Sequence, residues 1–73
     1  MAIVYENDTA YLNDVCTIEE GEEFFEWIKN TEEPKVDFKN TEHIHTAIFQ
    51  TILFFKPTLL NLDKESFWGK LLG

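Results

Sequence analysis

The sequence predicts a single α/β domain over residues 1–73, in which a mixed four-stranded sheet has its helices packed mainly on one face. Strand-like and helix-like segments alternate in the order β-β-α-β-α-β-α, which is typical of a sheet crossed by helices. The chain also holds seven Phe, two Trp and two Tyr, enough aromatic surface to fill a thin core. A chain of 73 residues has room for one such core.

The first two strands are predicted to form a hairpin. Residues 2–6 and 9–12 flank Asn7 and Asp8, which both tolerate the positive φ of a two-residue turn. This turn pairs residue 3 with 12 and residue 6 with 9. The alternation then places these apolar side chains on the core face: Ile3, Tyr5, Ala10 and Leu12.

Two helices follow from apolar spacing and end signals. Thr17 and Glu20 match a capping box, which predicts that the first helix begins there and buries Phe24 and Ile28. The second helix is predicted over residues 45–55. It is apolar around most of its circumference, so we expect it at the centre of the fold or at an interface.

Residues 35–38 and 58–62 are predicted as parallel strands, because the second helix connects them. Asp63 is expected to cap a last helix. The apolar stripe of that helix, either core or a dimer contact, comprises Phe67, Trp68, Leu71 and Leu72. The predicted core is Ile3, Tyr5, Leu12, Phe24, Ile28, Val36, Phe38, Ile48, Ile52 and Phe55.

The charge balance restricts the partners. Fourteen acidic residues against six lysines, with no arginine, give a net charge of −8, which argues against nucleic acid and anionic membranes. The acidic surface serves solubility, or it steers the domain toward a basic partner. No segment is long enough to span a bilayer and no targeting segment is visible, so we expect a cytoplasmic protein without membrane insertion.

Residues that could support catalysis or metal binding lack the necessary companions. Cys16 is the single cysteine, and we expect a buried thiol rather than a nucleophile. Glu42, His43 and His45 have no fourth ligand placed by the sequence, so no metal site is predicted. A Gly-rich phosphate loop is also missing. We therefore expect no enzyme activity, no catalytic residue and no cofactor.

Residues 36–50 read VDFKNTEHIHTAIFQ: an apolar-Asp-apolar strand, a polar loop, one apolar residue and a hydroxyl residue that opens a helix. This pattern resembles the core signature of STAS domains, the anti-sigma-factor-antagonist family. Asp37 matches the strand aspartate of that family, and Thr46 matches the serine that partner kinases phosphorylate. His45 and Ile48 stand where the family usually has Asp and Gly.

The resemblance implies a non-enzymatic regulator that docks another protein through the loop and the start of the second helix. The alternatives are a small accessory subunit of a larger complex, such as a transporter-associated STAS subunit, and a homodimeric protein. Ligands in open α/β sheets are met at such carboxyl-end loops. The predicted partner-binding residues are Lys39, Asn40, Thr41, Glu42, His43, His45 and Thr46.

Thr46 has two possible roles at the start of that helix. It is a possible phosphosite, because phosphate there would meet free backbone amides. We favour a plain N-cap hydroxyl. The competing docking surface is the open sheet face that carries Val4 and Tyr11.

Overall fold

The computed structural model describes residues 2–63, 65 and 67–72. Its strands are β1 (Ile3–Glu6), β2 (Thr9–Leu12), β3 (Asp14–Cys16), β4 (Lys35–Asp37), β5 (Thr41–Ile44) and β6 (Thr58–Leu60). Its helices are α1 (Gly21–Lys29), α2 (Thr46–Phe55) and α3 (Phe67–Leu72), and a 3-10 turn over Ile18–Glu20 precedes α1. Among the described residues, no helix combines the length and the apolar character needed to cross a bilayer.

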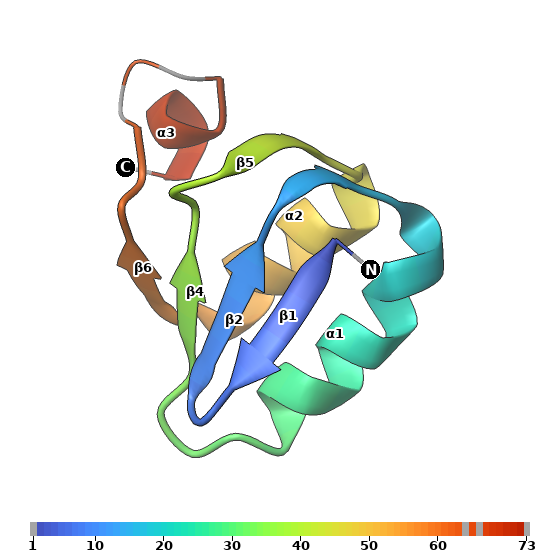
Figure 1. Cartoon of the computed structure of the whole chain (residues 1–73). Coiled ribbons are helices and arrows are strands. Elements are labelled where there is room, and N and C mark those ends of the chain that lie inside the picture. The colour runs from blue at the N-terminus through green and yellow to red at the C-terminus, as the bar shows by residue number, and fades with distance from the viewer. Residues whose placement is uncertain (1, 64, 66, 73) are drawn as a thin grey trace.

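The four-stranded sheet is mixed, as the sequence predicts. Its strand order is β1-β2-β4-β6, with β1 antiparallel to β2 and the other neighbours parallel. The predicted hairpin register is confirmed from Ile3 opposite Leu12 to Glu6 opposite Thr9, and Asn7 in the turn has a φ of 55°. Figure 1 shows α2 behind β1 and β2, α1 to the right of β1, and α3 beyond the carboxyl end of β4.

A second sheet of two short strands departs from the prediction. β3 and β5 pair in parallel, with Cys16 opposite Ile44. Residues 39–44 were expected to be a loop, and residues 14–16 carried no prediction. The pairing satisfies backbone groups over one end of the core, because the amide of Asp14 donates to Asn40 O (2.8 Å) and that of His45 to Cys16 O (2.9 Å).

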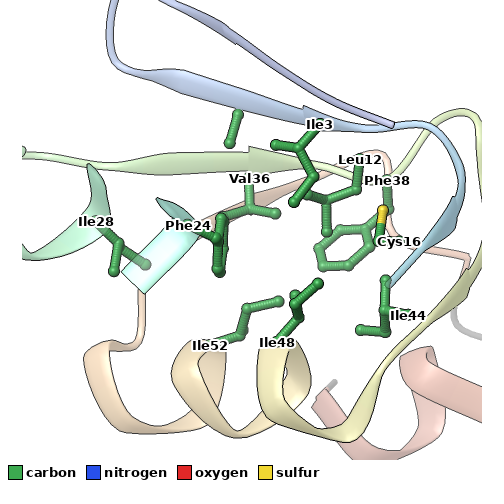
Figure 2. Close-up of a cluster of buried hydrophobic side chains, with 11 residues drawn as sticks. Ile3, Leu12, Cys16, Phe24, Ile28, Val36, Phe38, Ile44, Ile48 and Ile52 are labelled. Carbon is green, nitrogen blue, oxygen red and sulfur yellow. The ribbon is translucent and has the colours of Figure 1, made fainter. Parts of the chain in front are cut away.

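The core lies between the sheet and the two longer helices, where the labelled side chains converge in Figure 2. The buried apolar set is Ile3, Ala10, Leu12, Cys16, Phe24, Ile28, Val36, Phe38, Ile44, Ile48 and Ile52. Most of the predicted core is confirmed. Tyr5 and Phe55 are half-buried and pack against its margin instead. Cys16 and Ile44 join it because β3 and β5 close over that end.

The capping box predicted at Thr17 is wrong. The Thr17 side chain makes no cap hydrogen bond, and the residue precedes the 3-10 turn rather than α1. The Glu20 carboxylate instead accepts from the amides of Ala2 (3.2 Å) and Ile3 (2.9 Å). Glu20 thus holds the outer edge of β1, where unpaired backbone amides would otherwise remain exposed.

The last helix also begins differently from the prediction. Asp63 Oδ1 accepts from the amide of Glu65 (2.9 Å), and α3 starts only at Phe67, so Asp63 shapes the preceding turn rather than capping the helix. Leu72 packs against the core, whereas Leu71 is exposed, so the predicted stripe is divided. The side chains of Phe67 and Trp68 lie outside the described part of the structure.

Candidate functional site

The predicted partner-binding residues lie along β5 and at the start of α2. Lys39 and Asn40 form an exposed turn after β4, and Glu42 is exposed on β5. Thr41 is half-buried, and its hydroxyl donates to the backbone oxygen of Leu12. His43 is also exposed, and His45 is half-buried before the exposed Thr46. The predicted loop is thus held by a strand pair rather than being free.

The buried carboxylate of Asp37 fixes the turn that follows β4. Its Oδ1 accepts from the amide of Lys39 (2.8 Å), and its Oδ2 accepts from the Asn61 side-chain amide (3.1 Å). The amide of Phe38 donates to Leu60 O (2.9 Å) across the same strand ends. Asp37, which the STAS resemblance singles out, therefore ties the carboxyl ends of β4 and β6 together.

A recess of about 180 Å³ opens beside these strand ends. Its lining is Phe38, Lys39, Thr41, Glu42, Asn61, Leu62 and Asp63. The structure thus brings three predicted residues together with Asn61 and Asp63, which the sequence did not indicate. Asn40, His43, His45 and Thr46 are not part of this recess.

His45, not Thr46, is the N-cap of α2. His45 has an extended backbone (φ −68°, ψ 150°), and its Nδ1 accepts from the amide of Ala47 (3.0 Å). Thr46 is already the first helical residue, where its side chain cannot take the N-cap geometry. The expectation that the Thr46 hydroxyl caps this helix is therefore wrong.

This assignment makes a testable stability prediction. His45→Ala should lower the free energy of unfolding by about 1 kcal/mol, because the Ala47 amide loses its acceptor. Thr46→Ala should change it by less than about 0.5 kcal/mol, because the side chain is exposed. Urea unfolding of both variants measures the difference. A larger loss in Thr46→Ala than in His45→Ala would contradict the assignment.

The Cys16 thiol is a core group. Its Sγ lies 3.7 Å from Asn13 O, and the side chain is fully buried. Burial, followed by the nearby charges of Glu20 and Asp14, raises the pKa of Cys16 to about 11. A nucleophilic cysteine needs a lowered pKa, so this environment acts in the opposite direction.

No group of three or more His, Cys, Asp or Glu in the described ranges is arranged to hold a metal ion. Glu42 and His43 are successive residues of β5, so their side chains point to opposite sides of that strand.

An exposed aromatic surface lies on the helices. We call Phe25, Phe54 and Phe55 the aromatic face. Phe54 is 75% exposed and Phe25 is 41% exposed. Phe55 joins them edge-on, with ring centroids 5.4 Å from Phe25 and 4.9 Å from Phe54. The signal in the sequence was a helix apolar around most of its circumference, for which an interface was one of the two expectations.

A second hollow runs between β1 and α1, and we call it the β1–α1 groove. It has a volume of about 520 Å³ and is lined by Tyr5, Glu23, Glu26, Trp27, Asn30 and Thr31. The Tyr5 and Trp27 rings lie 5.3 Å apart and tilted by 41°. Nothing in the sequence indicated this groove, because Tyr5 and Trp27 meet only through the packing of α1 on the hairpin.

No protein-family model, no curated protein and no solved structure matches this chain. The resemblance of residues 36–50 to STAS domains therefore stays a prediction.

Proposed function

We propose that this domain is a non-enzymatic protein-binding module that docks a partner along the outer surface of α2. The observation that carries the proposal is Phe54, an aromatic side chain that is 75% exposed. Burying a Phe side chain contributes about 1.5–3 kcal/mol, and this stabilisation is largely unused in the isolated domain. A partner that covers Phe54 would recover it.

Thr46, the last of the predicted partner-binding residues, and Phe54 of the aromatic face lie on one stripe of α2. Thr46, Gln50 and Phe54 are spaced by four residues and are all exposed. Residues at this spacing lie on one side of a helix, over about 12 Å from Thr46 to Phe54. We call these three residues the outer stripe. It joins the helix start expected from the STAS resemblance to the aromatic face at the other end.

The charge of this surface favours protein binding. Helix α2 contains no charged residue from Thr46 to Phe55, although the whole chain has a net charge of −8. The centres of protein interfaces are depleted in charged residues and enriched in aromatic ones. The outer stripe combines both properties. An accessory subunit of a larger complex would use the same surface, so this alternative function predicts the same contacts.

Capture of partners from a lysate of the native organism tests the proposal with a matched pair of variants. Phe54→Ser should reduce capture by a factor of about 30, the usual loss for an aromatic at the centre of an interface. Val4→Ser, which alters an exposed apolar residue on the open sheet face, should capture as the wild type does. Thr46→Asp should also weaken capture, because it places a charge on the outer stripe.

The outcomes separate the competing surfaces. Loss of capture in Val4→Ser with full capture in Phe54→Ser would place docking on the open sheet face and overturn the proposal. Loss confined to a Glu42→Ser variant would place it at the recess instead. A wild-type chain that is dimeric, with a monomeric Phe54→Ser variant, would identify the partner as a second copy.

A further inference from the structure

We infer that the β1–α1 groove binds the guanidinium or ammonium group of a basic side chain carried by an extended segment of a partner protein. This inference rests on the proposed protein-binding function but uses a different surface, on the opposite side of α1 from Phe25. Three features of the groove carry it: an aromatic floor, two acidic side chains at its rim and an open strand edge beside it.

The floor is suited to a flat cation. Trp27 is half-buried and lies against Tyr5, and its ring also stacks on the core residue Phe24, with centroids 6.1 Å apart. Trp and Tyr faces attract cations through the ring quadrupole, and Arg also stacks on them. Because Phe24 is fully buried, the Trp27 ring is held in place before any ligand arrives.

Two glutamates supply negative charge at the rim of the groove. Glu23 and Glu26 are exposed and lie three residues apart on α1. No described residue forms an ion pair with either. Burial, followed by the charges of Glu23 and Glu20, raises the pKa of Tyr5 well above its usual range, so the phenol on the floor stays neutral. The chain contains no arginine, so a guanidinium must come from another molecule.

The neighbouring strand edge indicates an extended partner segment. The amide of Asn13 donates to Ala2 O (2.8 Å), so alternate residues of β1 direct their backbone groups toward β2 and away from it. The backbone N–H and C=O groups of Ile3 point away from β2, and the Glu20 carboxylate accepts from its amide. By the same alternation the backbone groups of Tyr5 also point away from β2, toward the edge at which an extended partner segment would add.

A strand added beside Tyr5 would place every second side chain on the helix side of the sheet, over the groove. The inferred ligand is therefore a basic residue within an extended segment. The net charge of −8 steers such a segment toward the domain.

Titration with two blocked peptides tests the inference. The first is acetyl-Thr-Val-Arg-Val-Thr-amide, and the second replaces Arg by citrulline, its uncharged isostere. Amide and indole shift mapping should show changes at residues 3–6 and 23–31 and at the Trp27 indole. We expect the arginine peptide to bind about tenfold more tightly than the citrulline peptide. The reason is that only the arginine side chain makes a cation–aromatic contact and is attracted by the two carboxylates. Equal binding of the two peptides would overturn the inference.

Variants locate the contact and separate this inference from the proposed function. The double variant Glu23→Gln/Glu26→Gln should weaken the arginine peptide about fivefold. The matched control Glu22→Gln/Glu65→Gln removes the same charge from exposed residues outside the groove and should bind as the wild type does. Phe54→Ser should bind the arginine peptide as the wild type does. A Phe54→Ser variant that captures no partner from lysate but still binds the peptide would therefore separate the two surfaces. Equal weakening in both double variants would show a general charge effect and contradict a site in the groove.

Discussion

Phe24→Ala is expected to lower the free energy of unfolding by about 3–5 kcal/mol. Phe24 is the largest fully buried side chain among the described residues, and its ring stacks on Trp27 at 6.1 Å. A domain of this size has a total stability of only about 3–5 kcal/mol without a disulfide or a metal. We therefore expect the variant to be largely unfolded at 25 °C, as measured by circular dichroism and urea titration.

The adjacent residue provides a matched control. Phe25→Ala removes the same side chain from the same helix, but Phe25 is 41% exposed and contacts Phe55 at the surface. Its loss should cost less than about 1.5 kcal/mol. If Phe25→Ala were the more damaging variant, α1 would present its other face to the sheet.

Asp37→Ala is expected to cost about 1.5–3 kcal/mol, because two hydrogen bonds to a buried carboxylate are lost. The effect should be concentrated where β4 and β6 end. Hydrogen exchange of the Lys39 amide should become faster in this variant, and urea unfolding gives the total loss.

Asp37→Asn separates the two hydrogen bonds. It keeps an oxygen for the Lys39 amide but presents a second NH₂ group to the Asn61 amide, so it should fall between Asp37→Ala and the wild type. Unchanged stability in Asp37→Ala would show that the turn after β4 does not depend on this carboxylate.

The sequence by itself determined the elements whose signals are local. The hairpin register from Ile3–Leu12 to Glu6–Thr9 follows from a two-residue turn, because a slip of one residue would turn the apolar set to the opposite face. The buried stripes of α1 and α2 follow from apolar spacing along each helix. The parallel pairing of β4 with β6 follows because α2 connects them.

The tertiary structure alone decided the features that join distant segments. The β3–β5 pair has three or four residues in each strand and few apolar positions. Its stability therefore comes from the segments of the chain that pack against it and not from local strand preference. Glu20 was expected to close a capping box. Its carboxylate instead accepts from the amides of Ala2 and Ile3, which lie 18 and 17 positions away in the sequence.

The surfaces that we propose for binding divide in the same way. The apolar circumference of α2 predicted either a central position in the fold or an interface, and the structure buries Ile48 and Ile52 while it leaves Phe54 exposed. The β1–α1 groove carried no signal, because Tyr5 and Trp27 are 22 positions apart and belong to different elements. Spacing within an element reports which of its faces is apolar. Which faces of two elements meet is set by the burial of the whole chain, and no single segment carries that information.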